Sequence, residues 1–292
     1  MWESYPWLTG SGTWADPYVI EWLYVNAQQL GACIFIYHST KPFIIRHCYL
    51  NNTGVAERDN GIHMIFAENG QIYGNIINYA RVAVSLGYEC NNISVYRNYL
   101  QSDEKRGTPG RAFRMTGQAH HCNFTQNVIN NYQQLALIST AHNVSIDGNL
   151  MNNTIYEEYV DPVIIFSGSS QMKFRYNILT DNYKWFDFGV DVVDSVNNTI
   201  INNSVISSLT GIQVPTPLLI NPVGMRPAQA TVNIMELSSS NNNLIANNYL
   251  YVPGEGGAIP SFNPFLLLGV MGSVSLMVIL TIQKKRKVTY II

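Results

Sequence analysis

Charged residues are scarce in this sequence, and neither sign dominates. Asp, Glu, Lys and Arg make up 12% of the 292 residues, and the formal net charge is −2 at pH 7. Proteins that bind nucleic acid through its phosphates need a basic surface, and here the run of four basic residues at 284–287 lies near the end of the chain. We therefore expect no nucleic-acid partner.

Cysteine is nearly absent, and its spacing indicates no metal site. The four cysteines, Cys33, Cys48, Cys90 and Cys122, form neither a CxxC pair nor a metal-finger pattern. Because a well-filled core needs no disulfide, we expect reduced thiols in the interior, with Cys48 as a small buried residue.

The histidines offer little for metal binding. His120 and His121, with Met115 and Cys122 nearby, provide the kind of soft donor set that copper prefers. Adjacent residues of a strand point to opposite faces, so both imidazoles cannot reach one ion from an extended segment. We expect no metal and no cofactor.

Helical periodicity is missing before residue 264, and a short repeat takes its place. An apolar residue, two variable residues, an asparagine and an apolar pair recur, for example at 72–77, 95–100 and 124–129. We call the asparagine position the anchor, and the anchors are Cys48, Asn75, Asn98, Asn127, Asn149, Asn177, Asn203 and Asn248. Successive anchors are 22–29 residues apart, except for a gap of 45 before the last. A recurring unit of this size with insertions indicates a solenoid.

The residues between the anchors predict the kind of solenoid. Short runs alternate with period two, which places one set of side chains inward and the other outward. Asn and Gly between the runs tolerate the left-handed backbone of tight corners. We therefore predict an all-β parallel β-helix over residues 1–252, with about nine coils of 22–29 residues stacked ~4.8 Å apart. The anchor amides are expected to hydrogen-bond from coil to coil and to be structural.

One long apolar run is present near the C-terminus. Residues 264–282 carry no charge, are long enough to cross a bilayer as a helix, and precede the basic run. Because basic flanks stay in the cytoplasm, we predict a linker at 253–263, a transmembrane helix at 264–282, a cytoplasmic tail at 283–292, and an extracellular or periplasmic β-helix. Residues 1–6 lack the features of a signal peptide. Two alternatives remain, a truncated or misassigned start, and a tail anchor with a cytoplasmic β-helix.

Residues 10–21 (GSGTWADPYVIE), together with the Asn-rich repeats, resemble the NosD-like right-handed β-helix family, whose repeats are also described as carbohydrate-binding and sugar-hydrolase (CASH) repeats. The resemblance covers residues 10–252. With the apolar run and basic tail, the chain is similar to prokaryotic, often archaeal, surface proteins of unassigned activity. The resemblance implies a right-handed coil but no particular chemistry, because this scaffold carries pectate lyases, polygalacturonases, epimerases and proteins without known catalysis.

Four insertions interrupt the repeat at the same point of the coil, after the apolar pair. They span 51–60, 101–110, 152–161 and 207–230, and stacked coils would bring them to one flank, where solenoids commonly bind ligands. A glycosidase needs two carboxylates ~5–10 Å apart. The candidates are Glu157, Glu158, Asp161, Asp187 and Asp191. Asp187 and Asp191 would be ~13 Å apart on an extended strand, and exposed loops are often charged without any function.

A row of outward residues is the second candidate site. In the strand before each anchor, equivalent positions are occupied by Arg46, Tyr73, Tyr96, Thr125, Asp147 and Arg175. Stacked ~4.8 Å apart, they would form an aromatic and polar strip that a sugar chain could bind. The candidate ligand-binding residues are Arg46, Tyr73, Tyr96, Asp147 and Arg175. Aromatic stacking that only stabilises the sheet is the alternative.

Three functions follow from these features. The leading one is a membrane-anchored surface protein without catalytic activity that binds glycans or partner proteins, because no catalytic constellation is fixed by the sequence. The alternative is a carbohydrate-active enzyme, a polysaccharide lyase or glycoside hydrolase, that uses the loop carboxylates. The third is a NosD-like accessory protein for a metal site, acting beside a transporter.

Overall fold

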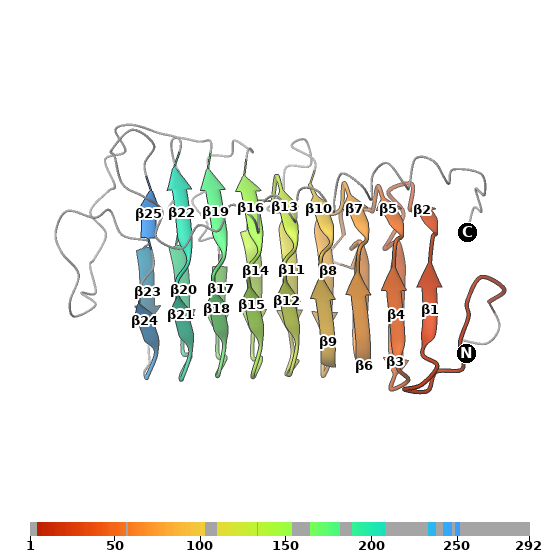
Figure 1. Ribbon diagram of the computed structural model, residues 1–292, viewed down its shortest axis with the longest axis horizontal. Helices are drawn as coiled ribbons and strands as arrows, with labels where there is room; N and C mark the ends of the chain where they lie inside the picture. The colour runs from red at the N-terminus through yellow and green to blue at the C-terminus, as the bar shows by residue number, and fades with distance from the viewer. Residues whose placement is uncertain are drawn as a thin grey trace.

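Figure 1 shows the computed structural model of the chain, which describes residues 5–56, 58–102, 110–132, 134–153, 164–181, 189–207, 233–237, 242–246 and 249–251. Within these residues the structure is an all-β parallel solenoid of 25 short strands, and this part of the chain contains no helix. The predicted parallel β-solenoid is confirmed. No helix of the described ranges is long and apolar enough to cross a membrane. The linker, transmembrane helix and tail predicted at 253–292 lie outside the described residues.

Each coil contributes strands to three faces, which we call A, B and C. Face A consists of β1 (Tyr18–Glu21), β4 (Phe43–Arg46), the end of β6 (Ile62–Tyr73), β9 (Asn91–Tyr96), β12 (Asn123–Thr125), β15 (Ser145–Asp147), β18 (Lys173–Arg175), β21 (Thr199–Ile201) and β24 (Leu244–Ala246). Face B is a 9-stranded sheet of β2 (Tyr24–Asn26), β5 (Tyr49–Asn51), β7 (Ile76–Asn78), β10 (Tyr99–Gln101), β13 (Val128–Asn130), β16 (Leu150–Asn153), β19 (Ile178–Asp181), β22 (Ser204–Ser207) and β25 (Tyr249–Tyr251). Face C consists of β3 (Ile34–Ser39), the start of β6, β8 (Val82–Gly87), β11 (Arg111–Thr116), β14 (Gln134–Ser139), β17 (Ile164–Ser167), β20 (Gly189–Val193) and β23 (Asn233–Leu237). Faces A and C are continuous through β6.

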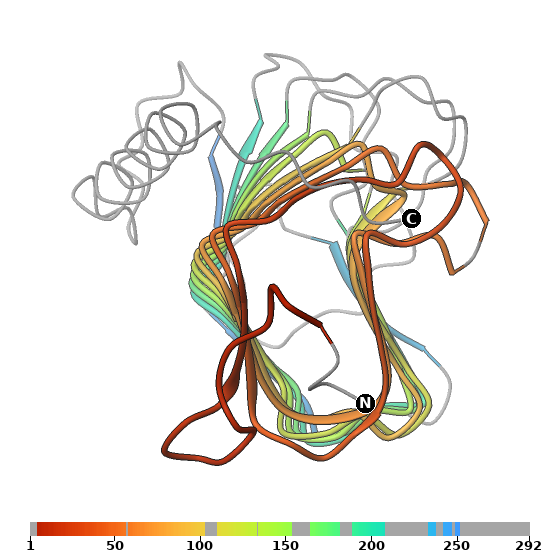
Figure 2. The same ribbon diagram turned by 90° about the vertical axis from the view of Figure 1, so that its right-hand side faces the viewer.

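The three faces enclose one core that runs the length of the solenoid. Viewed along the axis, successive coils superimpose around this interior (Figure 2). On face A the inward row is fully buried and aliphatic or aromatic throughout, and it consists of Ile45, Ile72, Val95, Phe124, Ile146, Phe174 and Ile200. Burying each such side chain contributes about 1.5–3 kcal/mol relative to leaving it in water.

The anchor asparagines form a continuous hydrogen-bonded ladder between faces A and B. The Oδ1 atom of Asn98 accepts from both the backbone N–H and the Nδ2 of Asn75, each at 3.0 Å. The same pair of bonds links Asn98 to Asn127, and the pattern repeats through Asn149, Asn177 and Asn203. Each amide is 0–1% exposed. The structural role predicted for the anchors is thereby confirmed.

Cys48 begins this ladder in place of an asparagine. Its N–H donates to Oδ1 of Asn75 at 3.0 Å, and its thiol donates to the carbonyl of Ile20 at 3.7 Å. Nδ2 of Asn75 donates to the equivalent carbonyl of the next coil, that of Ile45. Cys48 is thus the small buried residue that we predicted.

All four cysteines are free thiols. Cys48, Cys90 and Cys122 are buried and Cys33 is half-buried. Burial raises the pKa of Cys48 and Cys122 to about 12 and that of Cys33 and Cys90 to about 11. The prediction of reduced thiols is confirmed.

The tight corners depend less on Asn and Gly than the sequence suggested. The residue before each anchor from Cys48 to Asn203 has a left-handed backbone, and these residues include Arg97 (φ 54°), Gln126 (φ 55°) and Tyr176 (φ 56°) as well as Gly74 and Gly148. The last anchor, Asn248, lies outside the described residues. Such φ values are uncommon for residues with long side chains. They persist here because the ladder amides on either side hold the corner.

Candidate functional site

The outer side of face A carries the predicted row of residues. Arg46, Tyr73, Tyr96, Thr125, Asp147 and Arg175 are cross-strand partners in successive coils. In β9 the inward Ile93 and Val95 are fully buried, whereas Ser94 and Tyr96 point outward. The predicted stacking of these residues is confirmed, while their role in ligand binding stays a prediction.

At the N-terminal end of this row the charge of Arg46 is paired. Its Nε donates to Oε2 of Glu21 at 2.8 Å, and its Nη1 donates to the hydroxyl of Tyr73 at 3.1 Å. The hydrogen bonds to Tyr73 and to Glu21 raise the pKa of Arg46. This guanidinium therefore holds the tyrosine hydroxyl in place.

The two tyrosines stack on each other. The ring centroids of Tyr73 and Tyr96 are 4.9 Å apart with an interplanar angle of 18°. The Tyr96 hydroxyl donates to Oε1 of Gln71 at 3.1 Å, and partial burial raises the pKa of this phenol. The pair thus presents a neutral, oriented aromatic surface.

At the other end of the row Asp147 and Arg175 form an ion pair. Nε of Arg175 donates to Oδ1 of Asp147 at 3.1 Å, and Nη2 donates to Oδ2 at 2.6 Å. The hydrogen bond to Asp147 raises the pKa of Arg175, and Ser145 also donates to this carboxylate. The charged members of the row therefore neutralise one another or their neighbours.

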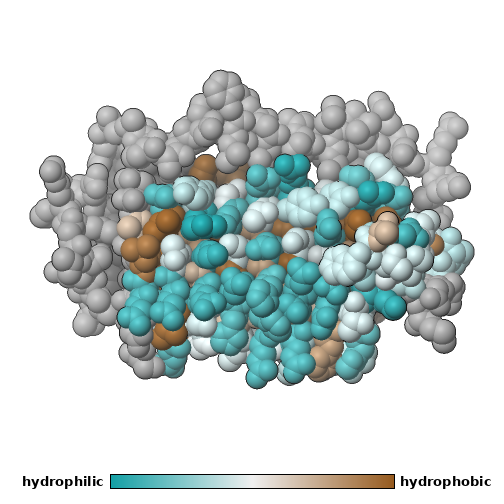
Figure 3. Space-filling view, turned by 60° about the horizontal axis from the view of Figure 1, so that its bottom comes forward, coloured by the Kyte–Doolittle hydropathy of each residue, from teal (hydrophilic) through white to brown (hydrophobic). Residues whose placement is uncertain are grey.

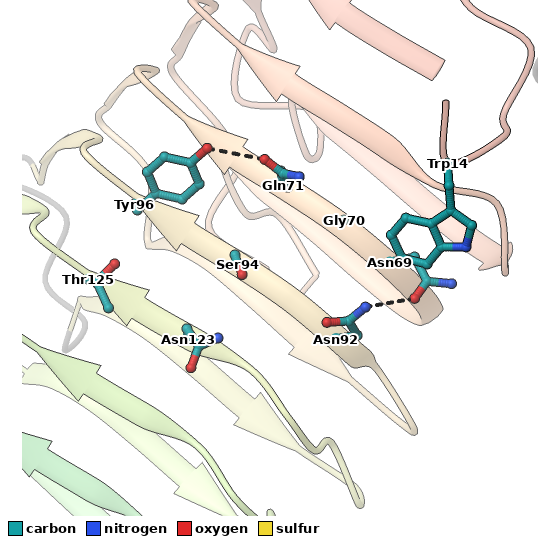
Figure 4. Close-up of a pocket in the computed structure, with 9 residues that line it drawn as sticks. All are labelled: Trp14, Asn69, Gly70, Gln71, Asn92, Ser94, Tyr96, Asn123 and Thr125. Carbon is teal, nitrogen blue, oxygen red and sulfur yellow. Dashed lines mark hydrogen bonds between the residues drawn. The ribbon is translucent and has the colours of Figure 1, made fainter. Parts of the chain in front are cut away.

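A groove of about 330 Å³ lies on this face. It is lined by Trp14, Asn69, Gly70, Gln71, Asn92, Ser94, Tyr96, Asn123 and Thr125, which come from β6, β9, β12 and the loop before β1. Figure 4 shows Trp14 at the margin beside Asn69, and Tyr96 at the opposite side of the groove with its hydroxyl toward Gln71. In the space-filling view, hydrophilic residues form a broad band over the lower half of the molecule (Figure 3).

Trp14 was missed by our sequence analysis because it precedes the first repeat. Its side chain is 71% exposed, so it adds little to the core. The loop that carries it is held by backbone hydrogen bonds from Ser11 and Thr13 to the carbonyl of Asp16, both at 3.1 Å. Gly12 has a φ of 71° and packs against the ring of Tyr18, which leaves no room for a side chain. The signal in the sequence was limited to an aromatic residue within a segment rich in Gly, Ser and Thr.

The remaining groove residues could have been found from the sequence. Gln71, Ser94 and Asn123 are cross-strand partners two residues before Tyr73, Tyr96 and Thr125. Period-two alternation gives them the same outward direction as the tyrosine row. Each strand of face A therefore carries two outward rows, the tyrosine row and the row of Gln71, Ser94 and Asn123.

The predicted carboxylate site is not brought together within the described residues. Glu157, Glu158, Asp161 and Asp187 lie outside them. Asp191 lies in β20, where it pairs with Ile165. In sequence, the insertions at 51–60, 101–110, 152–161 and 207–230 each lie between a strand of face B and a strand of face C. Residues 103–109, 154–161 and 208–230 of these insertions lie outside the described residues.

Histidines do not assemble a metal site in the part of the chain that the structure describes. The rings of His120 and His121 are 5.2 Å apart and edge to face, and Nδ1 of His120 contacts the carbonyl of Gln118. No group of three or more His, Cys, Asp or Glu side chains that could hold an ion occurs among the described residues.

The fold of this chain is similar to that of a solved protein. The chain is similar to the DFA-IIIase of Arthrobacter chlorophenolicus A6, solved as a cysteine-to-alanine mutant in complex with DFA-III, with 14% identity, a TM-score of 0.51, and coverage of 80% of this chain and 55% of that one. The structure of DFA-IIIase in complex with GF2 gives 14% identity, a TM-score of 0.52, and coverage of 80% and 57%. The chain thus spans little more than half the length of these proteins. At this identity the similarity shows the fold alone, a parallel β-helix. No protein-family model and no curated protein matches the sequence.

Proposed function

We propose that the chain is a carbohydrate-binding β-helix protein whose ligand lies on the outer side of face A. The observation that carries this proposal is the groove with Trp14 at its margin and Tyr96 at its other side, and amides and hydroxyls between them. Aromatic faces bind the apolar faces of sugar rings, while amides and hydroxyls bond to their hydroxyl groups. The fold similarity to DFA-IIIase is compatible with this function but does not test it.

The proposal predicts which aromatic residues matter. Trp14→Ala and Tyr96→Ala should each weaken glycan binding by about fivefold, since an aromatic contact contributes on the order of 1 kcal/mol. Binding is measured by screening the full chain on a glycan array and then titrating the best ligand.

A matched control exists on face B. Tyr24 and Tyr49 form a similar stack, with ring centroids 5.2 Å apart and an interplanar angle of 7°, on a face without this groove. Tyr49→Ala should therefore leave binding unchanged. Equal losses for Tyr49→Ala and Tyr96→Ala would show that the stacks act only through sheet stability, and absence of any glycan ligand would refute the proposal.

A carbohydrate-active enzyme is the second candidate, and an observation on face C favours it. His63, Ser85 and Arg114 are cross-strand partners there, with His63 only 6% and Ser85 only 3% exposed, and Asp191 continues this row three strands beyond Arg114, after Leu137 and Ile165. In sequence, each of the four insertions lies between a strand of face B and a strand of face C. A lyase or hydrolase could combine these groups with insertion carboxylates.

The enzyme candidate is tested by product analysis on every polysaccharide that binds. Release of unsaturated or reducing sugar that is abolished by Glu157→Gln or Asp161→Asn would establish catalysis at the insertions. If both variants still bind the polysaccharide and no product is released, the enzyme candidate is refuted and carbohydrate binding on face A remains as the proposed function.

The cellular setting is also a proposal. We infer from residues 264–292 that the β-helix domain, residues 1–252, is anchored by one transmembrane helix outside the cytoplasm, as in the NosD-like right-handed surface proteins that residues 10–21 resemble. Protease added to intact cells should remove the β-helix and leave a membrane-bound stub. Full protection of the domain would instead favour a cytoplasmic tail-anchored protein.

A further inference from the structure

The lining of the face A groove limits the kind of glycan that can bind. Its side chains are tryptophan, tyrosine, amides and hydroxyls, and none of them carries a charge at neutral pH. The nearby charges of the outward row are already paired, Arg46 with Glu21 and Arg175 with Asp147. Arg97, next to Tyr96, bonds to Gln126, and Lys173 lies two coils beyond Asn123 in the same row, so neither belongs to the groove lining. A uronic acid or sulfated sugar held by the lining residues would therefore lose its hydration without gaining a cation from them, which is unfavourable.

The polar groups of the groove recur across the coils rather than along one strand. Gln71, Ser94 and Asn123 are partners in three consecutive coils, which stack ~4.8 Å apart. Within the described residues, the side chains of Ser94 and Asn123 make no hydrogen bond with the protein, whereas Gln71 accepts one from Tyr96. Similar donors and acceptors are thus repeated at a spacing close to the length of one sugar unit in an extended chain.

Trp14 lies at one end of the row formed by Gln71, Ser94 and Asn123, which is the path that we consider for a ligand. It lies on the side of β6 that faces the first coils, so that the line from Trp14 to Asn123 crosses β6, β9 and β12 (Figure 4). Tyr96 stands beside that line, with its hydroxyl fixed by Gln71. An indole at the end of the path would stack on a terminal or near-terminal ring.

From this geometry we infer that the ligand is a neutral, extended polysaccharide chain that lies along the solenoid axis, with Trp14 stacking on one sugar and Gln71, Ser94 and Asn123 bonding to the next units. This inference rests on the proposed carbohydrate-binding function and specifies its ligand. Asn123 is the residue that sets how many units are recognised, because it is the groove amide farthest from Trp14.

The test is a titration of the full chain with two length series, from disaccharide to hexasaccharide. One series is neutral and linear, built from glucose, mannose or N-acetylglucosamine, and the other consists of oligogalacturonates. Affinity for a neutral series should rise up to about three or four units and then level off, since the groove crosses three coils ~4.8 Å apart. It should change less than about twofold between ~0.1 M and ~1 M salt, although screening shortens the Debye length from ~10 Å to ~3 Å.

Asn123→Ala should weaken binding of the tetrasaccharide about tenfold, the value of one good hydrogen bond, and leave the disaccharide unaffected. Thr199→Ala is the matched control, because Thr199 belongs to the same outward row three coils farther on and does not line the groove. Oligogalacturonates that bind more tightly and weaken with salt would overturn the neutral assignment while leaving carbohydrate binding intact. Equal effects of Asn123→Ala on all lengths would overturn the axial course. If neither series binds, the proposed function itself fails.

Discussion

Replacing Asn127 with leucine should destabilise the solenoid far more than the same change at Asn123 in the same coil. The Asn127 side chain is fully buried and makes four hydrogen bonds. Its Oδ1 accepts the N–H and Nδ2 of Asn98, and its Nδ2 donates to the carbonyl of Val95 and to Oδ1 of Asn149. Leucine has a similar size but can form none of these bonds.

The expected loss follows from the groups left without partners. The backbone N–H and the Nδ2 of Asn98 both lose Oδ1 of Asn127 as an acceptor in the buried interior, at about 1–3 kcal/mol each, so the free energy of unfolding should fall by roughly 2–6 kcal/mol. Asn123 is exposed and its side chain bonds to no described group, so Asn123→Leu should stay within about 0.5 kcal/mol.

The assay is urea unfolding of both variants, followed by circular dichroism. Because solenoids can unfold in parts, amide hydrogen exchange at Asn98 provides a local readout that does not assume two states. The Asn98 amide should exchange faster in Asn127→Leu and at the normal rate in Asn123→Leu. Equal stability of the two variants with an unchanged Asn98 amide would refute the role of the ladder.

Three further outcomes are expected. Gly12→Ala should weaken glycan binding as much as Trp14→Ala and lower the free energy of unfolding by roughly 1 kcal/mol or more, because alanine is strained at φ 71° and its methyl group would displace the loop from Tyr18. Unchanged binding in a titration would contradict this. The pKa of Cys122 is about 12 in the fold and 9.0 in the unfolded chain, so the stability that depends on its proton is present below pH 9 and is lost as the pH rises toward 12. In urea unfolding, the free energy of unfolding of the wild type should therefore fall by roughly 1.4 kcal/mol per pH unit above pH 9 relative to that of Cys122→Ala. If the free energies of the two proteins changed in parallel with pH, this prediction would be wrong. Asp147→Asn should lower the free energy of unfolding by less than about 1 kcal/mol in the same assay, because the ion pair with Arg175 is partly exposed. A larger loss would mean that this ion pair stabilises the coil.

The outward row could be predicted from the sequence because two local rules determine it. The anchor asparagine fixes where each coil turns, and period-two alternation fixes which residue before it faces outward. Tyr73 and Tyr96 therefore had to be neighbours once the repeat was recognised. The pairing of Arg46 with Glu21 also follows from this register, one coil earlier.

Trp14 could not be placed by such rules. Its position depends on a loop outside the repeat, and that loop is shaped by the contacts of Gly12 with Tyr18 and of Ser11 and Thr13 with Asp16. The corners show a similar limit. Arg97 and Tyr176 take left-handed backbone that their own side chains disfavour, because the hydrogen-bonded ladder of neighbouring coils outweighs the local preference.

Because side chains alternate inward and outward in face A, the residues that stabilise the core differ from those that line the groove. Ile93 and Val95 fill the core, while Ser94, between them, faces the groove, and its side chain makes no hydrogen bond to a described residue. A change at Ser94 therefore removes no core contact and leaves the anchors in place. Ser94→Ala should lower glycan affinity while thermal unfolding stays at the wild-type temperature, since a substitution at a partly exposed position away from the core changes stability by less than about 0.5 kcal/mol. If affinity and stability fell together, the groove would be part of the structural framework, and the assignment of Ser94 to ligand binding would be wrong.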